Sequence, residues 1–162
     1  MSRVAITSEN SAAIGPYSHG IDTGHLVFLS GQTPIDLATG TLVDSDIGAQ
    51  TRQCLDNLSA VLTAAGLSRE NVVKCNVFLV DMNDFGEMNE VYASYFTEPF
   101  PARTTVAVAG LPLGAQVEIE MIAQREELRT RRNEFITESS AGFDEFSADE
   151  IAKALAEARR NA

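Results

Sequence analysis

Val72-Val73-Lys74-Cys75-Asn76-Val77-Phe78-Leu79-Val80 is the strongest strand signal in this sequence. β-Branched and aromatic residues suit the pleated surface of a sheet, and they make up most of this stretch. We therefore predict a strand here. The segments on either side of it have a different period.

The segment before this strand has the period of a helix, from residue 46 to residue 65. Its apolar face holds Ile47, Cys54, Leu55, Leu58, Val61, Leu62 and Ala65, and the polar residues Gln50, Arg52, Gln53, Asp56 and Asn57 cluster away from it. Gly66 then provides a left-handed stop.

A second helix is predicted to begin at Asp84, which forms an acidic variant of the capping box with Glu87. Its apolar stripe consists of Phe85, Met88, Val91, Tyr92, Tyr95 and Phe96.

Further strands are predicted before and after the two helices, at residues 4–6, 26–31, 41–43, 104–109 and 116–124. The last two are expected to pair as a hairpin. In the final strand, alternation places Val117, Ile119, Met121 and Ala123 on one face and Glu118, Glu120 and Ile122 on the other.

This order of elements predicts an α+β fold in which two helices pack on one face of a mixed sheet. The other face then needs solvent or a partner to cover it. Residues 1–125 form the predicted domain, and residues 126–162 form a charged C-terminal extension with a short amphipathic helix that begins at a capping box, Ser147-Ala148-Asp149-Glu150.

The composition bears on the partners and the location of this protein. The chain has 162 residues and a net charge of −11, which disfavours nucleic acid and anionic lipid as partners. It has no apolar run of membrane-spanning length and no signal-peptide layout at its start, so we expect a cytoplasmic protein. Cys54 and Cys75 lie in apolar patterns and are interpreted as reduced core residues.

The sequence lacks the phosphate-loop, dinucleotide-turn, nucleophile-elbow and His-Glu-x-x-His motifs. Its two histidines, His19 and His25, cannot build a three-ligand metal site alone, so no metal site is predicted.

One arginine stands out in Phe100-Pro101-Ala102-Arg103-Thr104-Thr105-Val106. Pro99 and Pro101 restrict the backbone before Arg103, and a guanidinium aimed in this way can anchor a carboxylate through two charge-assisted hydrogen bonds. Arg103 could instead form a surface salt bridge. Glu120 becomes a candidate proton carrier if its face is partly buried, whereas Glu118 is interpreted as an exposed carboxylate.

Three other polar residues, Tyr17, Ser30 and Asn89, stand at the ends of predicted elements, where side chains commonly converge on a cleft. Each could equally be structural.

Six segments in collinear order together resemble the RidA/YjgF family of enamine and imine deaminases. They are Ile14-Gly15-Pro16-Tyr17-Ser18, Val27-Phe28-Leu29-Ser30-Gly31-Gln32, Gln50-Thr51-Arg52-Gln53, Asp81-Met82-Asn83-Asp84-Phe85, Pro101-Ala102-Arg103-Thr104-Thr105-Val106 and Val117-Glu118-Ile119-Glu120-Met121-Ile122-Ala123. The resemblance runs from about residue 3 to residue 125.

The resemblance implies a chorismate-mutase-like fold, a homotrimer with a cleft between each pair of neighbouring subunits, and no cofactor. It implies that Arg103 holds the substrate carboxylate and that Glu120 positions or activates the attacking water. Tyr17, Ser30, Asn89 and Thr105 would line the pocket. The expected reaction is hydrolysis of 2-imino or 2-enamino acids, such as 2-iminobutanoate and 2-iminopropanoate, to 2-oxo acids and ammonia.

Two departures bear on specificity. Many deaminating members carry cysteine where this chain has Thr105, and Gln-Ala is common where it has His19-Gly20. A threonine hydroxyl still forms hydrogen bonds, and the His19 side chain either lines the pocket or points away from it. The alternatives are a pathway-specific deaminase for an aminoacrylate or aminomuconate-type enamine, and a protein that binds carboxylate metabolites without turnover.

Overall fold

The structure is a computed structural model of the chain, and it describes residues 3–8, 15–43 and 46–125. The described residues all belong to one compact unit, Met1–Arg125. The charged extension at 126–162 and its predicted helix lie outside the described residues.

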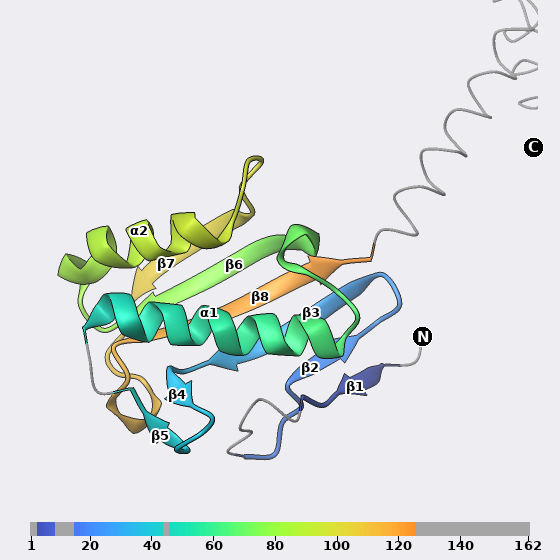
Figure 1. Cartoon of the computed structure of the whole chain (residues 1–162), viewed down its shortest axis with the longest axis horizontal. Helices are drawn as coiled ribbons and strands as arrows, with labels where there is room; N and C mark the ends of the chain where they lie inside the picture. Colours follow the sequence, from blue (N-terminus) through green and yellow to red (C-terminus); the bar gives the residue numbers. More distant parts are fainter. Residues whose placement is uncertain (1–2, 9–14, 44–45, 126–162) are drawn as a thin grey trace, which may run out of the picture. The chain divides into compact units, whose positions relative to one another are not determined.

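The unit contains a six-stranded sheet with the order β1-β2-β3-β8-β6-β7 (Figure 1). Its strands are β1 (Val4–Ile6), β2 (Gly20–Asp22), β3 (Leu26–Gln32), β6 (Val72–Leu79), β7 (Ala102–Ala107) and β8 (Val117–Gln124). Two further strands, β4 (Ile35–Asp36) and β5 (Thr41–Leu42), pair with each other. All neighbours in the large sheet are antiparallel except β6 and β7, so the mixed sheet is confirmed.

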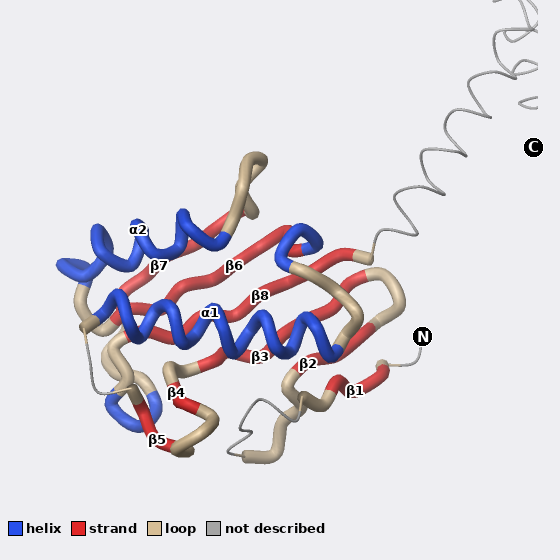
Figure 2. The backbone as a smooth tube through the Cα atoms, in the orientation of Figure 1, coloured by secondary structure: helices blue, strands red, loops and turns tan. Residues whose placement is uncertain are grey.

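Two helices, α1 (Ile47–Ala64) and α2 (Phe85–Tyr95), cover the same face of this sheet (Figure 2). Short 3₁₀ turns η1 (Arg69–Asn71), η2 (Met82–Asp84) and η3 (Pro112–Gly114) connect the elements. Asp46 caps α1 by accepting from the Ala49 amide at 2.7 Å, and Gly66 follows the helix with φ 69°. The predicted left-handed stop is therefore confirmed, and so is the α+β class.

The core lies between the helices and the sheet, and β8 shows how the sequence builds it. Its burial alternates strictly, with Val117, Ile119, Met121 and Ala123 buried towards the helices and the residues between them partly exposed. The predicted alternation is confirmed. Both cysteines are free and fully buried, as expected.

The predicted hairpin between the last two strands is wrong. β7 lies at the sheet edge and pairs in parallel with β6, whereas β8 lies between β3 and β6. Every second residue of β8 is fully buried, so this strand suits the sheet interior, while the more exposed β7 suits the edge. Because α2 connects β6 to β7, it also carries the chain back to the same sheet end, which makes the pair parallel.

The capping box predicted at Asp84 and Glu87 is also wrong. Asp84 already has helical dihedral angles and caps nothing, because η2 precedes α2 and Asp81 accepts from the Asn83 amide at its start. Glu87 instead accepts from the Gly48 amide at 3.3 Å and so contributes to the N-terminus of α1.

An ion pair joins the end of β8 to β2, a three-residue strand that the sequence patterns did not predict. The Arg125 Nε donates to Asp22 Oδ2 at 3.0 Å, and another guanidinium nitrogen donates to the Ala65 carbonyl at 2.9 Å. The hydrogen bond from Arg125 lowers the pKa of Asp22, and one from the Gly24 amide lowers it further.

This lowered pKa predicts a pH-dependent contribution to stability. Above about pH 3.9, the ordinary value for aspartate, the charged Asp22 stabilises the fold fully, and this contribution is lost as the pH falls through the lowered value. We expect Asp22→Asn to lower the free energy of unfolding by about 1 kcal/mol at pH 7 and by much less near pH 2. Urea unfolding at both pH values measures this, and an equal loss at both would contradict it.

Candidate functional site

A cavity of about 310 Å³ opens where β3, β4 and the connection from β7 to β8 meet. Its lining residues are Tyr17, Ser30, Gly31, Thr33, Ile35, Pro112, Leu113 and Glu118. The register of β3 against β8 shifts between Leu29 and Gln32, and this irregularity places Ser30 and Gly31 at the cavity.

Ser30 is fixed on this wall by two hydrogen bonds. Its amide donates to the His19 carbonyl at 3.0 Å, and its hydroxyl donates to the Ser18 carbonyl at 2.7 Å. Since the hydroxyl hydrogen is used, the Ser30 oxygen meets a ligand as an acceptor. Tyr17 stands beside it with 45% of its surface exposed.

Glu118 is the carboxylate of this cavity. A Cβ atom on Gly31 would lie 2.0 Å from Glu118 Oε1, so the carboxylate occupies the space that glycine leaves free. Burial raises the pKa of Glu118, and the neighbouring Glu120 charge raises it further. A carboxylate with a raised pKa is a better base and a better proton carrier near neutral pH than an ordinary one.

Glu120 is on the same face of β8 but is not among the residues that line the cavity. Its Oε1 accepts from Asn76 Nδ2 on β6 at 2.6 Å. The structure therefore places Glu118, and not Glu120, with Tyr17 and Ser30.

Arg103 lies in a different part of the unit, between edge strand β7 and helix α2. Its guanidinium donates to Asn89 Oδ1 at 2.7 Å and stacks on two rings of α2, 4.6 Å from the Tyr92 centroid and 5.6 Å from the Phe85 centroid. No carboxylate of the described residues lies within 4.0 Å of it. The alternative of a salt bridge within the described chain therefore does not hold.

Thr105 follows Arg103 on the same face of β7. Its hydroxyl oxygen is buried and has no hydrogen-bond partner within the described part of the chain. A buried hydroxyl without a partner is uncommon, and a ligand beside Arg103 could supply one.

Arg103 and Glu118 face opposite sides of the sheet. Arg103 is in register with Cys75, which is buried beneath the helices, whereas Glu118 is in register with Phe78 on the uncovered face. One small substrate cannot reach both side chains of the same copy across the sheet.

The side chain of His19 is buried and is not among the residues that line the cavity. Its Nδ1 accepts from the Ser8 amide at 3.0 Å, and only 6% of the residue is exposed. His19 therefore acts on the cavity through its carbonyl, which fixes Ser30.

Two amide side chains that were predicted to cluster away from the apolar face of α1 are in fact buried. Asn57 Nδ2 donates to the Thr33 and Ile35 carbonyls at 3.2 and 3.0 Å, so it holds the cavity rim. Gln50 accepts from the Gln116 amide at 2.9 Å and thereby fixes the start of β8. Helical period alone did not reveal these positions, because each amide is buried by bonding to backbone groups outside its own helix.

In the part of the chain that the structure describes, no group of three or more histidine, cysteine or acidic residues is placed to hold a metal ion. Neither α1 nor α2, nor any shorter helix among the described residues, combines the length and hydropathy of a membrane-crossing helix.

The fold and these groups define a class: a small α+β protein with a carboxylate-lined cavity on the open sheet face and a braced arginine at the sheet edge. Residues 7–125 match the family described as endoribonuclease L-PSP. The chain belongs to this family, which is also called RidA/YjgF.

Relatives of this chain include named deaminases. The chain is 47% identical over 128 residues to the 2-iminobutanoate/2-iminopropanoate deaminase of Escherichia coli. This match covers 77% of the chain and 99% of that relative. The chain is also 51% identical over 126 residues to a RutC family protein of Pyrococcus horikoshii, and this match covers 78% of the chain and 100% of that protein. The crystal structure of E. coli TdcF with bound serine is similar too, with a TM-score of 0.71 and 43% sequence identity. The match covers 75% of this chain and 98% of the TdcF chain.

Proposed function

We propose that this protein hydrolyses 2-imino and 2-enamino acids, such as 2-iminobutanoate and 2-iminopropanoate, to 2-oxo acids and ammonia. The observation that carries this proposal is the braced Arg103 guanidinium, which has no carboxylate partner within the described chain. A planar guanidinium pairs with a carboxylate through two parallel hydrogen bonds, and every such substrate has a carboxylate next to its reacting carbon.

The reaction needs little more than positioning and proton transfer. An enamine first takes up a proton on its third carbon and becomes the protonated imine. The carbon of the protonated imine is already electrophilic, so water adds to it and gives up one proton, and the nitrogen gains one. The carbon–nitrogen bond then breaks, the remaining hydroxyl proton leaves with the nitrogen as ammonium, and the 2-oxo acid forms. One carboxylate can take a proton from the water and return it to the departing nitrogen. Such a proton carrier contributes typically 10² to 10⁴ in rate.

We assign this carboxylate role to Glu118, which adjoins Tyr17, Ser30 and Gly31 and has a raised pKa. The sequence pointed to Glu120, whose carboxylate is instead held by Asn76. The Glu120 charge raises the pKa of Glu118 further, and we propose that Glu120 contributes to the reaction in this way.

The opposite orientations of Arg103 and Glu118 support a site shared between two copies of the chain, as in the expected homotrimer. The uncovered face carries apolar side chains that a neighbour could bury, among them Phe28 and Val106, which are 44% and 41% exposed. In this arrangement one copy contributes Arg103, Asn89 and Thr105, and its neighbour contributes the Glu118 cavity.

A second candidate function is the binding of carboxylate metabolites without turnover. The serine bound in the TdcF crystal structure supports this candidate, because serine carries a carboxylate. A pathway-specific deaminase would use the same groups on one enamine. The ribonuclease named in the family description fits this chain less well, because a net charge of −11 repels a phosphate backbone. Cytoplasmic location and independence from cofactors stay predictions.

A coupled assay tests the proposal. Threonine dehydratase or an amino-acid oxidase generates the imine, and 2-oxo acid release is followed with and without this protein. We expect faster release, and a panel of imines and enamines then separates the general deaminase from the pathway-specific one. No acceleration, combined with thermal stabilisation by serine or 2-oxobutanoate, would favour the binding protein instead.

A further inference from the structure

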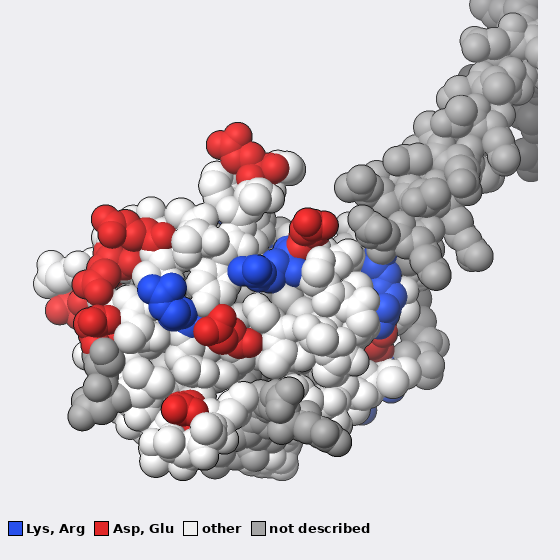
Figure 3. Space-filling model, in the orientation of Figure 1, with Lys and Arg blue, Asp and Glu red and all other residues white. Residues whose placement is uncertain are grey.

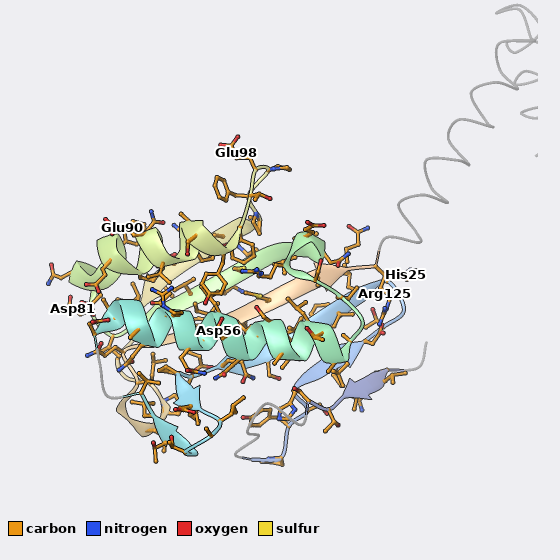
Figure 4. The ribbon with its side chains drawn as sticks, in the orientation of Figure 1. His25, Asp56, Asp81, Glu90, Glu98 and Arg125 are labelled. Atoms are coloured by element: carbon orange, nitrogen blue, oxygen red, sulfur yellow. The ribbon has the colours of Figure 1, made fainter. Side chains whose placement is uncertain are left out.

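A second cavity lies on the helix side of the unit, where the second half of α1 approaches η1 and the end of α2. Its volume is about 370 Å³, and all but one of its lining residues are polar: Asp56, Ser59, Thr63, Ser68, Arg69 and Tyr95. Figure 4 shows Asp56 on α1, on the side of the sheet that the helices cover. Acidic and basic side chains are interspersed over this face (Figure 3).

Two opposite charges line this cavity without pairing. Asp56 and Arg69 both border it, yet the ion pair between Arg125 and Asp22 is the only one within 4.0 Å among residues 3–8, 15–43 and 46–125. The two charges are therefore more than a salt-bridge distance apart across a shared space. A ligand that carries both charges can bridge them.

Tyr95 holds both charged groups. Its hydroxyl donates to Asp56 Oδ1 at 2.7 Å, and the Arg69 guanidinium stacks on its ring, 5.1 Å from the centroid. Burial, together with the bond to Asp56, raises the pKa of Tyr95 to about 12, so the phenol stays a donor at neutral pH. A carboxylate has about four acceptor positions, so Asp56 retains capacity for a ligand.

Besides the Tyr95 phenol, three serine and threonine hydroxyls line the cavity, and they favour a ligand that donates hydrogen bonds. Ser59 donates to the Leu55 carbonyl at 2.7 Å, Thr63 to the Ser59 carbonyl at 2.9 Å, and Ser68 to Asn71 Oδ1 at 3.3 Å. Each hydroxyl hydrogen is used within the protein, which leaves oxygen lone pairs for a ligand. An ammonium group, with three donors and no acceptor, matches this set.

We propose that this cavity binds a small zwitterion with the chemistry of a free amino acid, its ammonium at Asp56 and the hydroxyls and its carboxylate at Arg69. The site does not depend on the proposed deaminase activity, and it shares no lining residue with the Glu118 cavity. It lies on the helix side, so covering the open sheet face with another copy leaves it accessible.

The test is a titration of the full-length, ¹⁵N-labelled protein with L-alanine, followed by the backbone amide signals. We expect saturable shifts at residues 56–69 and at Tyr95, with an affinity in the millimolar range. Propanoate and ethylamine, which each carry one of the two charges, should bind at least about fivefold more weakly, because each leaves one charged wall without a partner.

A pair of variants with the same charge change makes the test specific. Arg69→Gln should weaken L-alanine binding by about tenfold or more, because it removes the carboxylate partner. Arg3→Gln removes an exposed arginine next to β1 that does not line the cavity and should change the affinity less than threefold. Equal losses in both variants, propanoate binding as tight as that of L-alanine, or shifts confined to Ser30 and Gly31 would each overturn the proposal.

Discussion

Arg103→Ala is expected to lower kcat/KM for imine hydrolysis by at least about 100-fold. Two hydrogen bonds from a charged donor to the substrate carboxylate contribute roughly 1.5–3 kcal/mol each, and a loss of 2.7 kcal/mol already corresponds to about 100-fold. The fold should tolerate the change, because Arg103 is partly exposed and forms no ion pair within the described residues.

Two further variants show whether the guanidinium itself is needed. Arg103→Lys keeps the charge but loses the planar fork and the stacking on Tyr92 and Phe85, so its activity should fall between wild type and Arg103→Ala. Arg3→Ala removes an exposed arginine outside both cavities and should act like wild type. The coupled assay measures kcat/KM for all three variants. A value for Arg103→Ala within threefold of wild type would contradict the proposed role of Arg103 as the carboxylate anchor.

Glu118→Gln is expected to lower kcat by about 10² to 10⁴, because the amide can neither accept the proton from water nor return it to nitrogen. Glu120→Gln is its matched control, since it makes the same chemical change two residues along the same face of β8. We expect this second variant to retain activity within about tenfold. The reverse ranking would show that the water-activating carboxylate is Glu120, as the family resemblance implied.

Glu120→Gln should also differ from wild type in its pH dependence. A base must be deprotonated to act, so the raised pKa of Glu118 should make wild-type activity fall on the acid side at a higher pH than an ordinary glutamate would. Burial is the main cause of this shift and the Glu120 charge is the second. Glu120→Gln should therefore move the acid limb of the kcat/KM profile to lower pH, and an unmoved limb would contradict the coupling.

The sequence was sufficient for the elements whose side chains repeat with a clear period. The apolar face of α1 and the alternation of β8 are local patterns, and both were predicted correctly. The positions of β7 and β8 in the sheet were not, because strand order depends on which strand gains burial from two neighbours. A local sequence pattern does not predict which strand has two neighbours.

The candidate site was predictable in part, for a related reason. Alternation places Glu118 and Glu120 on the same face, so it cannot separate them. What separates them is the irregularity of β3 near Ser30 and Gly31, together with the space that Gly31 leaves for Glu118. Asn57 was assigned to a polar surface because a helical pattern does not show that a distant loop needs its amide.

A mixing experiment distinguishes a site shared between neighbouring copies from a site within one copy. Arg103→Ala and Glu118→Gln chains are each purified, unfolded and refolded together in equal amounts, and imine hydrolysis is then measured. In any closed ring of randomly mixed chains, an active site between two neighbours needs Arg103 from one kind of chain and Glu118 from the other, which has a probability of one half times one half. We expect recovery to about a quarter of wild-type activity if the site is shared. Mixtures no more active than the separately refolded variants would show that each copy uses its own Arg103 and Glu118.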